Sequence, residues 1–338
     1  MDIDYNNEDS SPRERGPGPG TARFWVVWGI VFAAVLLALV ALLPAFLREA
    51  GFGASKSVVL YCAQDQTSAE PILRYFQRSR GVRVKTVFDS EAVKTVGLAN
   101  RLLAEKENPQ CDLFWGNEEL RTRQLARRGV FQETNGWTAF GYRSRRIVVG
   151  TNQLPVLEGP RSLLELTNPV WQGKVALSYP QFGTTATHFH ALRQLWGDAL
   201  WESWCRGLAA NKPFLVDGNS VVVDLVGKGV ALIGLTDSDD IVAGQAKGYP
   251  VDGMPLNGES LLIPNTLGIV RNARNAGRAQ LLYEHLQSPM VIEALVRRGA
   301  LEGPSAAELQ KGTLKVDWER LLENVDQTTA RLNTIFLR

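Results

Sequence analysis

The sequence contains few of the residues from which disulfide frameworks and metal centres are usually built. Its 338 residues include three cysteines and three histidines. Cys62, Cys111 and Cys205 are too few and too scattered for a disulfide framework or a zinc site, and we expect three small buried apolar side chains. Cys62 ends one predicted strand and Cys111 begins a neighbouring parallel one, so these two are not expected to pair.

Enzyme motifs are absent as well. His188 and His190 are two residues apart, so on a helix they point in different directions and cannot form a His-x-x-x-His zinc pair. There is no Gly-x-Ser-x-Gly nucleophile elbow, no His-Glu-x-x-His motif and no Gly-x-x-x-x-Gly-Lys-Ser/Thr phosphate loop. The sequence therefore predicts neither catalysis nor ATP hydrolysis, and no cofactor is required.

The charge composition gives no case for nucleic acid. Lysine and arginine together number 37, aspartate and glutamate 35, and the formal net charge is +2. No basic stripe with interleaved aromatic residues occurs, and such a stripe is the usual electrostatic footprint of a nucleic-acid-binding protein. Apolar residues make up 45% of the chain, which is ordinary for a globular protein, and the length leaves room for two domains.

The N-terminal part differs from the rest. Residues 1–23 are polar and rich in Pro, Gly, Asp and Glu, which predicts a disordered tail. Residues 24–47 are almost wholly apolar and uncharged, and a bilayer-spanning helix needs about 20 residues. Arg13, Arg15 and Arg23 precede this run, which favours a cytoplasmic tail and a single-pass anchor in the inner membrane, with the body on the periplasmic side. A cleaved signal peptide is the alternative.

From Val58 onward, short apolar runs alternate with helical patterns. This alternation predicts a mainly parallel α/β sheet with helices on both faces. The predicted strands are Val58–Cys62, Val82–Phe88 and Asp112–Trp115, and the predicted helices are a segment from about Thr67 to Gly81, Glu91–Glu105 and Glu118–Arg128. Towards the C-terminus, Ser260–Ile269 is a further predicted strand, followed by the predicted helices Ala276–Gln287, Pro289–Arg298 and Val316–Leu337.

Three strand-to-helix turns in the middle of the chain carry small polar or acidic residues. Backbone N–H groups at a helix start lack intrahelical partners and can face a ligand. In an open α/β sheet such turns gather along one edge, which predicts a binding cleft. The strands are Val175–Tyr179, Phe214–Val216 and Val230–Leu235, and the turns that follow them are Gly183–Thr185, Asp217–Ser220 and Thr236–Asp240.

Eight blocks of sequence, in order from about Ser57 to Ala300, resemble one protein family. The family is that of the extracellular solute-binding proteins of ABC importers, in the branch usually called iron(III)-binding. The blocks are Val58–Asp65, Phe88–Asn100, Asp112–Glu119, Gly141–Val148, Phe182–His188, Gly218–Leu225, Ile233–Asp240 and Leu262–Thr266.

The resemblance implies a two-lobed, type 2 periplasmic-binding fold with a hinge between its two doubly wound sheets. Residues 57–145 and 258–300 would form one lobe, and residues 146–257 and 301–338 the other. Such proteins close over a small solute and deliver it to a membrane permease driven by a separate ATPase, and we expect a monomer. A membrane-tethered sensor that uses the same cleft is the alternative function.

The resemblance also implies candidate metal ligands. Ferric members of the family hold iron with a His, a Glu and a Tyr-Tyr pair, and the matching positions here are Asp65, Asn117 and Thr236-Asp237. Ferric iron would accept oxygen ligands from Asp65 and Asp237, and Glu118 is a further candidate. Because both tyrosines are replaced, the ligand identity stays open.

The anion-binding half of the family pattern matches more fully. Ferric members hold carbonate or phosphate at helix starts, and the matching residues here are Gly183, Thr184, Thr185, Asn219 and Ser220, with Arg143 or Arg145 as a bidentate partner. A site with carboxylates and an anion-binding turn suits either a metal with its anion or a zwitterion. Phosphonates, polyamines and thiamine-like solutes are therefore alternatives to iron.

Several of these residues have a simpler explanation. Asp65, Thr184, Thr185 and Asn219 stand at helix starts, where such side chains often cap the helix without any ligand. Carboxylates in a first turn, such as Asp239 and Asp240, gain from the helix dipole alone. These structural roles remain alternatives at this point.

Overall fold

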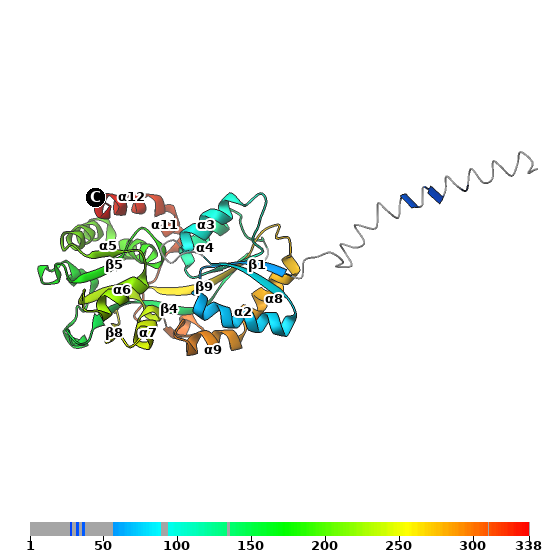
Figure 1. Cartoon of the computed structure of the whole chain (residues 1–338). Helices are drawn as coiled ribbons and strands as arrows, with labels where there is room; N and C mark the ends of the chain where they lie inside the picture. The colour runs from blue at the N-terminus through cyan, green and yellow to red at the C-terminus, as the bar shows by residue number, and fades with distance from the viewer. Residues whose placement is uncertain are drawn as a thin grey trace, which may run out of the picture. The chain divides into compact units, whose positions relative to one another are not determined.

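The computed structural model describes residues 57–88, 94–133, 136–309 and 311–337, together with Trp28, residues 32–33 and residues 36–37. The chain divides into two units, Met1–Ser55 and Lys56–Arg338, and the second is the body considered below (Figure 1). The predicted tail at residues 1–23 and most of the predicted anchor at residues 24–47 lie outside the described residues. In the part that is described, no helix has both the length and the apolar character that crossing a membrane requires.

The body contains one mixed sheet in two halves. In the first half the strands lie in the order β2-β1-β3-β9-β4. β2, β1 and β3 are parallel, as predicted, whereas β9 runs antiparallel to both β3 and β4. The strands of this half are β1 Ser57–Cys62, β2 Arg83–Phe88, β3 Leu113–Gly116, β4 Trp137–Gly150 and β9 Leu262–Ile269. Its helices are α2 Gln66–Arg80, α3 Lys94–Ala104, α4 Glu119–Arg127, α8 Ala276–Leu286 and α9 Pro289–Arg297.

The second half continues from the other end of β4. There β4 pairs antiparallel with β7 and β8, and β7 is followed by parallel β5 and β6. α5 contains a kink at Gly197, whose φ of 75° lies in the left-handed region that glycine adopts without strain. The strands of this half are β5 Val175–Ser178, β6 Phe214–Val216, β7 Ile233–Asp237 and β8 Val251–Met254. Its helices are α5 Gly183–Ala210, α6 Asn219–Gly227 and α7 Ser238–Ala246, and three 3₁₀ turns lie at Val156–Glu158, Leu163–Thr167 and Pro169–Trp171.

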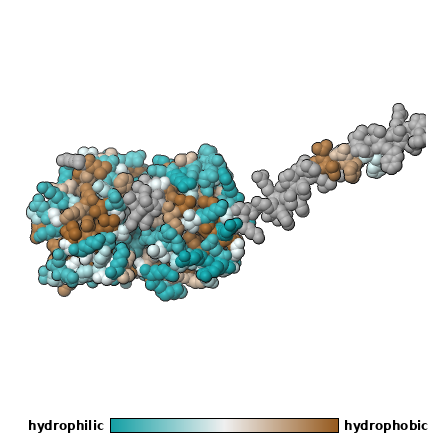
Figure 2. Space-filling view, viewed as in Figure 1, coloured by the Kyte–Doolittle hydropathy of each residue, from teal (hydrophilic) through white to brown (hydrophobic). Residues whose placement is uncertain are grey.

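Each half has its own apolar core on both faces of the sheet. In the first half, α2, α8 and α9 cover one face with side chains such as Phe76 and Leu282. In the second half, the main cluster includes Phe189, Trp204 and Leu235. On the surface shown in Figure 2, apolar residues gather in two separate areas, and hydrophilic residues cover most of the outer edge. The 14-residue strand β4 is shared by both halves.

The C-terminal region differs from its prediction as a single helix. Asn324 separates α11, Trp318–Glu323, from α12, Val325–Phe336, and a short α10 spans Ala306–Leu309. The Asn324 backbone, at φ −100° and ψ 2°, serves as the C-cap of one helix and the N-cap of the next, which interrupts the periodic pattern. α12 packs on the second half, whereas α11 contacts both α4 and α5. The lobe boundaries inferred from the resemblance stay predictions.

Truncating Leu332 tests whether α12 belongs to the core of the second half. Leu332 is wholly buried, so Leu332→Ala should lower the free energy of unfolding by about 2–5 kcal/mol through lost transfer energy and a residual cavity. Leu337→Ala, at a side chain that is 53% exposed, is the matched control and should change stability little. Urea unfolding measures both, and equal small effects would mean that α12 is not part of this core.

Candidate functional site

The three turns predicted to line a cleft meet at the carboxylate of Asp237. Its Oδ1 accepts a hydrogen bond from Arg145 Nη1 at 2.6 Å. Its Oδ2 accepts from Thr184 Oγ1 at 2.9 Å and from Asn219 Nδ2 at 3.3 Å. Arg143 Nη2 lies 3.4 Å from the same oxygen. We call Arg145, Thr184 and Asn219 the donor nest, because they come from β4, α5 and α6 and surround one anionic group.

Strand register places the central ion pair. β4 and β7 are antiparallel, and Arg145 lies directly opposite Asp237. Directly opposed residues on one face of a sheet are close enough to interact, and residues two apart share that face. Arg143 therefore reaches the same carboxylate as Arg145. Asp237 and Arg145 are 2% and 0% exposed, so the pair is shielded from water.

The guanidinium groups keep Asp237 ionised. Burial alone would raise the pKa of this carboxyl group, but attraction to Arg145 and Arg143 outweighs burial and lowers its pKa below the ordinary value. For Arg143, burial would lower the pKa, and the carboxylates of Asp239 and Asp237 raise it above the ordinary value instead. Both partners are therefore charged at neutral pH.

Asn219, Thr185 and Thr236 also make hydrogen bonds to other groups of the protein. Asn219 Oδ1 accepts from Arg145 Nη1 at 3.1 Å, from Ser178 Oγ at 3.2 Å and from Thr185 Oγ1 at 3.3 Å. Thr236 Oγ1 donates to the backbone oxygen of Asn219 at 3.2 Å. These bonds fix the nest around Asp237.

The helix-capping alternative fails at most of these positions. Asp65 and Asp237 occupy N-cap positions, but neither side chain makes a capping hydrogen bond. The N-cap residue of α5 is Phe182, and that of α6 is Gly218, so neither the threonines nor Asn219 cap a helix. Gly183, with φ 58°, begins α5, and Ser220 is the second residue of α6.

Glu118, in contrast, is a capping residue. Its carboxylate accepts from the backbone N–H groups of Leu120 at 2.7 Å and Arg121 at 2.9 Å at the start of α4. It also accepts from Thr187 Oγ1 of α5 at 3.0 Å, which links the two halves of the body. Burial raises the pKa of this carboxyl group. Asn117, its neighbour, contributes its backbone oxygen to Arg143 Nη2 at 2.9 Å.

Three more carboxylates lie beside the nest, and we call Asp65, Asp239 and Asp240 the acidic cluster. One carboxylate oxygen each from Asp237, Asp239 and Asp240 lies within 4.8 Å of the others. Asp65 comes from the first half of the body, yet its charge acts on Asp239 and Asp240 in the second. Arg143 Nε lies 3.2 Å from Asp239 Oδ1. The cluster therefore gathers groups from both halves.

The acidic cluster contains more carboxyl groups than its arginine neighbours can neutralise, and the pKa values of two of them are raised. Burial raises the pKa of Asp239 to about 7; repulsion by Asp237 and Asp65 adds to burial, and Arg143 opposes it. Burial and repulsion by the same neighbours, together with Asp239, raise the pKa of Asp240 well above its ordinary value. Counting Asp237, four carboxyl groups face two guanidinium groups here. A bound cation would relieve this repulsion.

Asn265 and Trp115 are two further residues of interest at this edge of the sheet, and neither is among the solute-binding residues predicted from the sequence. Asn265 is wholly buried, and both atoms of its side-chain amide lack a hydrogen-bond partner in the described part of the chain, as does Trp115 Nε1. β3 ends with Gly116 opposite Thr266, so Asn265 lies one residue beyond the end of β3 at this edge of the sheet. Polar atoms that are buried without partners are costly, so both residues are further candidates for solute contact.

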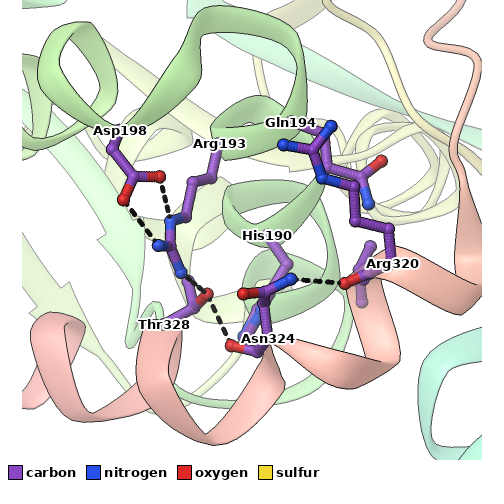
Figure 3. Close-up of a pocket in the computed structure, with 8 residues that line it drawn as sticks. His190, Arg193, Gln194, Asp198, Arg320, Asn324 and Thr328 are labelled. Carbon is purple, nitrogen blue, oxygen red and sulfur yellow. Dashed lines mark hydrogen bonds and ion pairs between the residues drawn. The ribbon is translucent and has the colours of Figure 1, made fainter.

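A separate polar pocket of about 50 Å³ lies between α5 and the C-terminal helices (Figure 3). Arg193 donates to Asp198 from Nε and Nη2, each at 2.8 Å, and to Thr328 from Nη1 at 2.6 Å. Burial lowers the pKa of His190 to about 3, so this imidazole is neutral. Because each nitrogen of Arg193 already donates to a protein oxygen, we assign this pocket a structural role in attaching α12.

Comparison with known proteins identifies the family. Residues 58–300 match the sequence profile of a family described as bacterial extracellular solute-binding proteins. The chain belongs to this family. A protein of Haemophilus influenzae described as uncharacterised is 23% identical over 274 residues, which are 72% of this chain and 77% of the relative.

Solved structures of solute-binding proteins share the fold. Iron-bound HitA from Pseudomonas aeruginosa superposes with a TM-score of 0.72 at 17% identity, covering 82% of this chain and 99% of HitA. AfuA from Actinobacillus pleuropneumoniae, solved with fructose-6-phosphate, superposes with a TM-score of 0.72 at 17% identity, covering 84% of this chain and 99% of AfuA. Apo ferric ion-binding protein A of Pasteurella haemolytica superposes with a TM-score of 0.71 at 16% identity, covering 83% of this chain and 98% of that protein. The predicted family and the predicted α/β periplasmic-binding fold are confirmed.

The raised pKa of Asp239 predicts how stability without solute depends on pH. A carboxyl group whose pKa is higher in the folded state stabilises the fold while it is protonated, and that contribution is lost as pH rises from about 4 through 7. We expect the melting temperature of the solute-free protein to fall by about 2–4 °C for each kcal/mol lost over this range. Asp239→Asn should flatten the fall, and Asp252→Asn, on an exposed strand residue, should not.

Thermal unfolding between pH 5 and 8 provides the measurement. The raised pKa of Asp240 acts in the same direction, so the double variant Asp239→Asn/Asp240→Asn should flatten the profile further. A profile with the same slope in wild type and double variant would contradict the charge assignment of the acidic cluster.

Proposed function

We propose that this protein is the solute-binding component of an ABC importer and that it captures a small solute bearing positive charge at the acidic cluster. The solute would then pass to a membrane permease powered by a separate ATPase. The single observation that carries the proposal is the gathering of four carboxyl groups, one buried and three partly buried, around two guanidinium groups where the two halves meet. We further propose that residues 24–47 tether the binding body to the membrane, on its extracytoplasmic side.

Ferric iron is the first solute to consider, because two of the proteins that share the fold are described as iron-bound HitA and a ferric ion-binding protein. Iron(III) is a hard cation, and hard cations prefer oxygen ligands. The oxygens of Asp237 already accept bonds from the nest, so Asp239 and Asp240, together with Asp65, are better placed to bind it.

An organic cation is the second solute class that the contacts support. Arg143 is buried, its Nε lies 3.2 Å from Asp239 Oδ1, and its Nη1 has no hydrogen-bond partner among the described residues. A zwitterion could place its amine at the acidic cluster and its oxyanion at Arg143 Nη1. A sugar phosphate such as fructose-6-phosphate, bound by AfuA, carries only negative charge and would meet the carboxylates of this cluster.

Solute binding would act by stabilising the contact between the halves. Asp65 approaches Asp239 and Asp240 from the opposite half, and these like charges repel one another. A cation placed between them converts repulsion into attraction, and the effect is strong because burial lowers the effective dielectric constant. A ligand shifts a conformational equilibrium only through such differential affinity. The hydrogen bond between Glu118 and Thr187 is an additional link across the same boundary.

A thermal-shift screen on the purified full-length protein tests this function. The panel contains ferric iron, putrescine, thiamine, 2-aminoethylphosphonate and fructose-6-phosphate. A solute at 100 times its dissociation constant should stabilise the protein by about 2.7 kcal/mol. We expect a shift with at least one cation-bearing solute and none with fructose-6-phosphate.

The variants of the acidic cluster serve as the matched test. Asp239→Asn/Asp240→Asn should lose at least about tenfold in affinity for whichever cation-bearing solute binds wild type, whereas Asp252→Asn should bind like wild type. Isothermal titration calorimetry measures the affinities. Binding of fructose-6-phosphate, or undiminished cation binding by the double variant, would contradict the proposal.

A further inference from the structure

The donor nest has the composition of an anion-binding site. Arg145 supplies a charged donor, Thr184 a hydroxyl and Asn219 an amide, and Asn219 and Thr184 stand at or next to helix starts. Charge-assisted bonds of this kind, at the positive end of helix dipoles, are what proteins use to hold small oxyanions. In this chain, however, the nest surrounds the carboxylate of Asp237.

Asp237 uses the donors that an external anion would need. Thr184 Oγ1 donates to Asp237 Oδ2 at 2.9 Å, and Arg145 Nη1 donates to Oδ1 at 2.6 Å. Nε and Nη2 of Arg145 have no partner among the described residues, but the whole side chain is 0% exposed. A second anion at this place would also be repelled by the ionised carboxylate of Asp237 itself. The donors that an external anion would use are therefore already bonded to Asp237.

We propose that Asp237 is a built-in counter-anion, so that this protein binds its cationic solute without carbonate, phosphate or any other companion anion. The inference takes the positive charge of the solute from the proposed function. That Asp237 occupies the donor nest does not depend on the proposed function. An internal carboxylate is covalently attached and already ordered, so solute binding incurs no entropic cost for immobilising a second molecule.

Removing the Asp237 carboxylate should turn the donor nest into an open anion-binding site. Asp237→Gly leaves Arg145, Thr184 and Asn219 without their shared acceptor, and glycine is tolerated at the N-cap of α7 that Asp237 occupies. Formate or bicarbonate should then enter the nest and raise the melting temperature of this variant. Asp237→Asn is the matched control, because its amide fills the same space and should leave no room for an added anion.

The anion titration compares wild type, Asp237→Gly and Asp237→Asn in full-length protein, with sodium chloride added to keep ionic strength constant. We expect a saturable increase in melting temperature with formate or bicarbonate for Asp237→Gly, and none for the other two. Saturable stabilisation of wild type by these anions, to the same extent as the variant, would overturn the proposal. Absence of rescue in a folded Asp237→Gly would overturn it as well.

A second arm uses ferric iron as the probe and does not depend on the folding of any variant. Iron affinity of wild type should change by less than about twofold when carbonate and phosphate are removed by dialysis, and an increase of about tenfold or more on adding either anion would contradict the internal counter-anion. If wild type binds no cation while Asp237→Gly is still rescued by formate, the nest is as proposed and only the proposed function fails.

Discussion

The buried ion pair between Asp237 and Arg145 is the interaction on which the rest of the site depends. Its two residues are opposite one another on β4 and β7, and the Asp237 carboxylate also accepts hydrogen bonds from Thr184 of α5 and Asn219 of α6. Burying two charges carries a large desolvation cost, which is offset only when geometry is good and further hydrogen bonds are made. The nest supplies these bonds, so three strand-to-helix turns are fixed around one anionic group.

The acidic cluster acquires its properties from this arrangement. Because Arg145 is occupied by Asp237, and Arg143 is divided between Asp237 and Asp239, little positive charge remains for Asp240 and Asp65. These partly buried carboxyl groups repel each other across the boundary between the two halves when ionised, and this repulsion adds to the effect of burial in raising the pKa values of Asp239 and Asp240. Under the proposed function, a cationic solute would offset this repulsion where the two halves meet.

The sequence was sufficient to predict the alternating elements, the three polar turns and their convergence at one edge, since each depends on local periodicity and on the rules of α/β sheets. It could not show that Asp237 occupies the centre of the nest, because that depends on the register of β4 against β7, which joins residues 92 positions apart. Local pattern also failed at Asn324, which divides the last helix. Glu118, a candidate ligand from the resemblance, is a helix cap, a distinction that only the contacts of its carboxylate reveal.

The central claim is that Asp237 is a permanently ionised group held by the protein's own donors, and its titration tests this most directly. Carbon-13 NMR of protein labelled at aspartate side-chain carboxyl carbons, with Asp237→Asn and Asp239→Asn to assign the two signals, reports each ionisation separately. The Asp237 signal should stay constant from pH 8 down to its ordinary pKa of about 3.9, because the pKa of this group is lowered, while that of Asp239 should titrate near 7. An Asp237 signal that titrates at or above the ordinary value would contradict the account.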